Sequence, residues 1–230
     1  MLNQAFFYHQ SIKKYIVSLS HIFNDLHIQR STSEGTSVKD VKIPLSYGQK
    51  QKLFNILERN TTIDRRIDTF LPRIDFEMTG LSPDPTRQKN VVREIDVANG
   101  NDFNSTFNGV AYNFNFEVNL ICRYLDDMYQ ALEQVLATFN PDYQNLTVSL
   151  IPSLGISHNV KVVLNDVQTE VNTDMGEDDF RSCEATLDFT LQGYLYKPIA
   201  TNGKVINSVI IDLNDYDTDE TYSILTAGLE

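Results

Sequence analysis

The chain has 230 residues, of which 41% are apolar and 22% are charged. This composition suits a folded protein of one large or two small domains, and the 13 Phe and 11 Tyr residues argue against disorder. The formal net charge is −12, and residues 141–230 carry −11 of it, with 4 Lys and Arg against 15 Asp and Glu. An acidic C-terminal part repels phosphate backbones and argues against bulk nucleic-acid binding, and we expect no sequence-specific nucleic-acid binding.

The two cysteines, Cys122 and Cys183, are too few for a disulfide scaffold or a zinc site. We expect them to be buried thiols in a reducing compartment. No apolar run reaches the roughly 18 residues that a membrane span needs. The first lysines follow an aromatic cluster, which is the wrong order for a signal peptide. We therefore expect a protein made in the cytoplasm, without contact to a membrane.

The first part of the chain predicts a helix followed by a hairpin. An amphipathic helix is expected over residues 12–26, because seven apolar side chains fall within an arc of about 120°: Ile12, Tyr15, Ile16, Leu19, Ile22, Phe23 and Leu26. Short strands at 27–30 and 41–45 follow, and Pro44 restricts the second strand to an edge or a strand end. We then expect a weaker helix over 48–59, a strand over 74–78 and a turn at 80–85, GLSPDP.

The middle of the chain contains the clearest patterns. Residues 86–108 lack a period, and their composition indicates an exposed loop over 99–105. Residues 110–120 alternate between apolar and mainly polar side chains, which predicts a strand. Residues 125–139 then predict a second amphipathic helix, ended by Asn140-Pro141, with its apolar side formed by Leu125, Met128, Tyr129, Leu132, Val135, Leu136 and Phe139.

Four further strands are expected at 146–151, 160–170, 183–196 and 205–213. Because strands follow strands after residue 140, the sequence predicts an α+β fold. We expect a mixed, mostly antiparallel sheet with two to three flanking helices. The most economical division is a single α+β domain over residues 1–199 and a C-terminal extension with an acidic tail over 200–230.

The motifs of common enzymes are absent from the sequence, including the phosphate-binding loop, the nucleophile elbow, the dinucleotide turn and HExxH. The acidic run at 212–220 fails as a calcium loop, because its sixth and twelfth positions are Glu220 and Thr226. His21 and Asp25, one helical turn apart, suit a surface ion pair better than catalysis. We therefore predict no catalytic residue, no metal and no cofactor.

The polar side of the second helix is the candidate binding surface. Its residues are Arg123, Asp126, Asp127, Gln130, Glu133 and Gln134. A purely structural interpretation competes with this one. Carboxylates in a first turn complement the helix macrodipole, and Arg123 is within reach of Asp127.

Six segments together carry a resemblance to a known family. RYLDDMYQALEQVLATFNP (123–141) directly follows YNFNFEVNLIC (112–122), and FFYHQSIKKYIVSLSHIFNDLHIQR (6–30), VKIPLSY (41–47), FLPRIDFEM (70–78) and EATLDFTLQGYLYKPI (184–199) accompany them in order. In these segments the chain resembles the tail sheath stabiliser and completion proteins of T-even-like contractile-tailed bacteriophages.

The resemblance implies a structural virion protein without enzymatic activity. Such a subunit forms a homo-oligomeric ring, a hexamer, at the head-proximal end of the tail. It caps the tail-tube terminator, grips the last sheath ring and offers a surface to the neck proteins. A tail-tube terminator or a neck connector is the alternative within virion assembly, and binding to both sheath and neck protein would separate them. An enzyme with an unrecognised site is the alternative from another class, and a metal analysis would test it.

Overall fold

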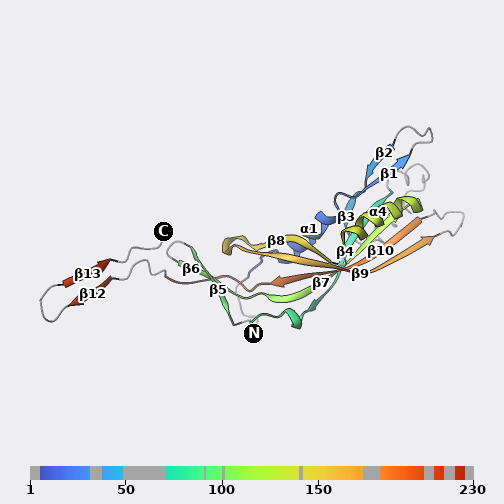
Figure 1. The fold of residues 1–230 in the computed structure, drawn as a ribbon. Helices are drawn as coiled ribbons and strands as arrows, with labels where there is room; N and C mark the ends of the chain where they lie inside the picture. The colour runs from blue at the N-terminus through green and yellow to red at the C-terminus, as the bar shows by residue number, and fades with distance from the viewer. Residues whose placement is uncertain are drawn as a thin grey trace. The chain divides into compact units, whose positions relative to one another are not determined.

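The computed structural model describes residues 6–31, 38–48, 71–90, 92–99, 102–139, 142–172, 182–204, 210–214 and 221–225. They belong to two compact units (Figure 1). The first unit takes residues 1–89 and 110–195, and the second takes 90–109 and 196–230. Residues 90–109 therefore group with the C-terminal residues, although they lie inside the expected 1–199 domain. The division of the chain after residue 199 stays a prediction.

The first unit is built on a six-stranded sheet whose neighbours are all antiparallel except β3 and β4, which are parallel. In spatial order the strands are β3 (Leu45–Tyr47), β4 (Arg73–Pro83), β7 (Val110–Cys122), β10 (Ser182–Leu195), β9 (Ile156–Asn172) and β8 (Asp142–Ile151). The predicted α+β class with a mixed, mostly antiparallel sheet is confirmed.

The two central strands, β7 and β10, supply the apolar face of this sheet. Phe116 lies opposite Phe189, and Cys122 lies opposite Cys183. All four side chains are at most 1% exposed. The alternating sequence pattern therefore predicted these buried side chains correctly. Both cysteines are free, buried thiols, as predicted. Burial first, and then the nearby Asp127 carboxylate, raises the pKa of the Cys122 thiol to about 12.

Two α-helices of the described residues pack on this apolar face, one after the other along it. They are α1 (Ser11–Phe23) and α4 (Leu125–Thr138). The ring of Phe23, at the end of α1, is 5.3 Å from Phe189 and 6.4 Å from Phe139, which follows α4. Farther along β7, the Tyr15 ring lies 4.7 Å from Phe114. The helix expected over 48–59 lies outside the described residues.

The predicted hairpin after the first helix is present as β1 (His27–Ser31) and β2 (Val38–Lys42). The second strand, however, does not run through residues 41–45. It ends before Pro44, and the chain leaves the hairpin to form β3 in the main sheet. Proline lacks the N–H that a ladder needs, so the break falls where it stands. Asp25 pairs with Lys42 of this hairpin at 3.1 Å, where an ion pair with His21 was expected.

The turn predicted at 80–85 is wrong for most of its length. β4 continues through Gly80 to Pro83, with a bulge between Met78 and Gly80. The chain turns only at Asp84, which begins the short 3₁₀ helix Pro85–Arg87. The Asp84 carboxylate accepts hydrogen bonds from the Thr86 N–H at 3.0 Å and the Thr86 hydroxyl at 2.6 Å, and it pairs with the Arg87 guanidinium at 2.7 Å.

The second unit contains strands where the sequence predicted a loop. β6 (Asp102–Phe107) lies between β5 (Glu94–Asn99) and β11 (Ala200–Lys204) in a three-stranded sheet. Within this unit Thr106 donates a hydrogen bond to the Lys197 carbonyl at 3.2 Å. β12 (Ile210–Asn214) and β13 (Thr221–Leu225) pair with each other. β12 overlaps the end of the strand expected over 205–213; the start of that strand and most of the acidic run lie outside the described residues.

Candidate interaction surface

The helix α4 presents three different sides, and each has its own surroundings. The side toward the sheet is buried and consists of Met128, Ala131, Leu132 and Val135. The second side faces the β1–β2 hairpin, and the third faces away from both. Asp126 and Asp127 lie in the first turn, where carboxylates complement the helix macrodipole.

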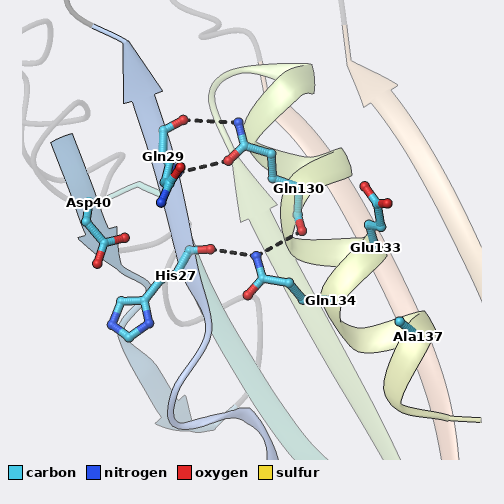
Figure 2. Close-up of a pocket in the computed structure, with 7 residues that line it drawn as sticks. All are labelled: His27, Gln29, Asp40, Gln130, Glu133, Gln134 and Ala137. Carbon is cyan, nitrogen blue, oxygen red and sulfur yellow. Dashed lines mark hydrogen bonds between the residues drawn. The ribbon is translucent and has the colours of Figure 1, made fainter. Parts of the chain in front are cut away.

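Side-chain amides of α4 occupy the backbone groups along the open edge of β1 (Figure 2). Gln130 accepts a hydrogen bond from the Gln29 N–H at 2.9 Å and donates to the Gln29 carbonyl at 3.1 Å. Gln134 donates to the His27 carbonyl at 2.7 Å. The two amides therefore take the place of a neighbouring strand, and they block this edge of β1 against pairing with another chain.

An ion pair fixes the far end of the same contact. Arg30 approaches the Asp127 carboxylate at two points, Nη2 to Oδ2 at 2.5 Å and Nε to Oδ1 at 3.3 Å. Asp127 is only 2% exposed. The Arg30 side chain is 32% exposed, so the pair is half-buried, and removing Arg30 would leave a buried carboxylate without this cation, which destabilises the fold. The hairpin is therefore held to α4 by charge and by amide hydrogen bonds together.

A groove of about 540 Å³ remains between the hairpin and α4. It is lined by His27, Gln29, Asp40, Gln130, Glu133, Gln134 and Ala137. Figure 2 shows the Asp40 carboxylate on the hairpin side and the Glu133 carboxylate on the helix side. Among the described residues neither carboxylate has an ion-pair partner. The groove is therefore acidic, and it suits a cationic group.

The third side of α4 differs from the sequence prediction. Tyr129 and Leu136, expected on the buried arc, are 56% and 43% exposed. They lie next to the groove, because Glu133 is one helical turn from each of them. An apolar strip beside the Glu133 carboxylate, with the Asp40 carboxylate across the groove, has the mixed character of a protein–protein contact surface.

The six candidate interface residues therefore separate into two groups, with Arg123 apart from both. Asp127, Gln130 and Gln134 hold the hairpin of their own chain. Asp126 and Glu133 are exposed, although Asp126 also accepts a hydrogen bond from Gln130 at 2.8 Å. Arg123 is half-buried, with its guanidinium 5.9 Å from the Tyr124 ring centre. The role of this set in binding other molecules stays a proposal.

Sequence reasoning missed the hairpin residues His27, Gln29 and Asp40. Gln29 and Gln130 are 101 positions apart, and no local period links them. A weak signal existed in the compact group of amides on one helix side, since amide side chains readily satisfy exposed backbone groups.

The part of the chain that the structure describes contains no group of three His, Cys, Asp or Glu side chains placed to hold a metal. Within the same residues, no helix combines the length and the apolar character needed to cross a membrane. Of the scattered histidines, His158 has a lowered pKa, caused first by burial and then by the nearby Lys89 ammonium.

An α+β unit with exposed apolar side chains beside carboxylates on one helix has the kind of surface through which structural proteins contact their neighbours. Comparison with known proteins gives the family. Residues 6–226 match the family described as T4-like virus Myoviridae tail sheath stabiliser. The chain belongs to this family, which is one of structural bacteriophage tail proteins. It is also 23% identical, over 217 residues, to "Tail completion protein gp15" of Enterobacteria phage T4, covering 91% of this chain and 79% of that protein.

The resemblance stated from the sequence is thus confirmed. The protein is a structural component of a phage tail, and it associates with other tail components in the virion.

Proposed function

We propose that this protein completes the head-proximal end of a contractile tail. Several copies, six in our proposal, form a ring that caps the tail-tube terminator, holds the last ring of sheath in its extended form and provides the docking surface for the neck. The observation that carries this proposal is the family match across residues 6–226, which includes both units of the chain.

The first unit has features that suit a load-bearing ring subunit. A helix layer packs on a six-stranded sheet, and the half-buried Arg30–Asp127 pair holds the hairpin to α4. These contacts fix the surface around the groove, so little ordering entropy is lost on binding. Asp126 and Glu133 are then the members of the candidate interface that face a neighbour.

Tails assembled without a completion protein test this function. Purified protein is added to such tails, and the fraction with extended sheath is counted by electron microscopy over several days. We expect the added protein to preserve the extended sheath and to restore joining to heads. Tails that contract at the same rate with and without it would contradict the proposal.

Binding to single partners separates the proposed role from its alternatives. The protein should bind both purified sheath protein and purified neck protein. A tail-tube terminator would bind tube and sheath without neck, and a neck connector would bind neck without sheath. The matched control is Arg30→Met, which should loosen the hairpin and lower binding while the six-stranded sheet still unfolds cooperatively.

A further inference from the structure

Three consecutive aromatic side chains are exposed before α1. Phe6 is 94% exposed, Phe7 44% and Tyr8 65%. Ile12 and Lys13, in the first turn of α1, are exposed as well. We call these five residues the N-terminal patch. Clustered exposed aromatics of this kind mark surfaces that another molecule covers.

The outer side of α4 has complementary properties. Tyr129 and Leu136 offer an apolar strip, and Asp126 and Glu133 place two carboxylates beside it. We call these four residues the helix patch. The carboxylate of Asp40 adds to its negative charge from across the groove (Figure 2). The N-terminal patch is aromatic and positive, whereas the helix patch is apolar and negative.

The two patches cannot meet within one copy. Phe23 contacts Phe139 at the C-terminal end of α4, and Tyr15 contacts Phe114 farther along β7. The N-terminal end of α1, which carries Ile12 and Lys13, therefore points away from α4. At 1.5 Å per residue, the 13 residues of α1 alone separate the patches by about 20 Å.

We propose that the helix patch of one copy binds the N-terminal patch of the next copy. The aromatic rings of residues 6–8 pack on Tyr129 and Leu136, and the Lys13 ammonium pairs with the Glu133 carboxylate. Because two different surfaces meet, the contact is heterologous and repeats from copy to copy, which is how rings are built. The inference rests on the proposed function, since it names the contact between ring subunits.

Mixing two defective chains tests the direction of this contact. One variant carries Phe6→Ser, Phe7→Ser and Tyr8→Ser, and the other carries Tyr129→Ser and Leu136→Ser. Sedimentation of each alone should show the dissociation constant for self-association raised by about tenfold or more. A mixture should form heterodimers, because the second variant supplies an intact N-terminal patch and the first an intact helix patch. Two defective chains that do not recover on mixing overturn the proposal.

A charge exchange tests the polar part of the contact. Lys13→Glu and Glu133→Lys should each weaken association, and the chain carrying both changes should regain it. Leu81→Ser with Val171→Ser is the matched control, because both side chains are exposed apolar residues outside the patches. All replaced side chains are exposed, and thermal unfolding of every variant verifies the fold.

Tail binding separates this inference from the function it rests on. Serine variants that assemble like the unaltered chain, or an unaltered chain that stays monomeric both free and on tails, overturn the contact. If those variants assemble and still protect the sheath, the proposed function stands without the contact. If the unaltered chain assembles through this contact yet never protects a tail, the contact stands and the proposed function fails.

Discussion

Gly193 is the residue that lets α1 lie close to β10. A methyl group at this position would come within 2.6 Å of Tyr15 Cζ and 2.8 Å of Phe114 Cε2. The Tyr15 hydroxyl donates to the Tyr194 carbonyl at 2.9 Å and accepts from the Tyr194 N–H at 2.8 Å. A shifted ring would therefore also lose the two hydrogen bonds that join α1 to the strand.

We predict that Gly193→Ala lowers the free energy of unfolding by about 1–3 kcal/mol, the usual cost of overpacking a core. Chemical denaturation measures the change. The matched control is Gly80→Ala on β4, where the nearest atom to a new methyl group is the Asn115 amide nitrogen at 3.7 Å. Equal losses of unfolding free energy in the two variants would show that the change in backbone freedom is the cause and that the close Tyr15 ring is not.

The Asp84 carboxyl, at the end of β4, makes the stability of the fold depend on pH. The side-chain hydrogen bond from Thr86 and the bond from Arg87 hold the pKa of its carboxyl far below the usual range. A carboxyl with a lowered folded-state pKa stabilises the fold above its unfolded pKa, about 4. That stabilisation disappears as the pH falls toward the folded value.

We predict that Asp84→Asn is less stable than the unaltered chain at pH 7 and that the difference shrinks steadily below pH 4. Thermal unfolding at a series of pH values follows it, with Asp96→Asn at an exposed position as the control. A difference that is constant from pH 7 to pH 2 would mean that the carboxylate charge is not the cause.

At the scale of the elements, four carboxylates lie directly opposite one another across four neighbouring strands of the main sheet. In order across β4, β7, β10 and β9 they are Glu77, Glu117, Asp188 and Asp166. Like charges directly opposite each other destabilise a sheet. Burial, followed by the Glu117 and Asp166 charges, raises the pKa of Asp188.

We predict that Asp188→Asn stabilises the protein at pH 7 by about 0.2–1 kcal/mol, because it removes two like-charge pairs. A raised folded-state pKa means that the ionised carboxyl opposes folding, so the gain should vanish as the pH falls and Asp188 takes up its proton. Denaturant unfolding at pH 7 and near pH 4 measures this. Destabilisation at pH 7 would show that Asp188 accepts hydrogen bonds that outweigh the repulsion.

The sequence predicted best those elements that have one apolar side and one polar side. β7 and β10 are central strands with one core side and one polar side, so buried and half-buried residues alternate over 114–118 of β7 and 185–193 of β10. β4 was cut short because Gly80 and Pro83 indicate a turn. Residues 80–83 pair with β7 alone among the described strands, and such an edge tolerates a bulge and a proline.

The candidate surface could be predicted only in part. Periodicity places Tyr129 and Leu136 near the apolar arc of α4, but their burial depends on what packs beside the helix. The sheet covers the arc at Met128, Ala131 and Val135 and stops short of those two side chains. The partners of Asp127 and Gln130 are 97 and 101 positions away, and a helix pattern holds no information on them.

At the scale of the whole molecule, the main sheet and the C-terminal strands are built from different parts of the chain. Every strand of the six-stranded sheet and both described helices come from residues before 196. Among the described residues after 199, β11 pairs with β6, and β12 and β13 pair with each other. The C-terminal strands can therefore be removed without taking a strand from the main sheet.

We predict that a chain ending at Ile199 keeps the cooperative unfolding of the first unit and loses assembly. An edge strand in this region can pair with a neighbouring subunit or with sheath protein. Losing only two such hydrogen bonds, at about 1 kcal/mol each, weakens binding to tails by at least about tenfold. A chain ending at Leu225 is the control, because it retains all three C-terminal strands. Full ring formation and sheath retention by the shorter chain would show that the C-terminal strands make no contact needed for assembly. The contacts between subunits would then lie on the first unit alone.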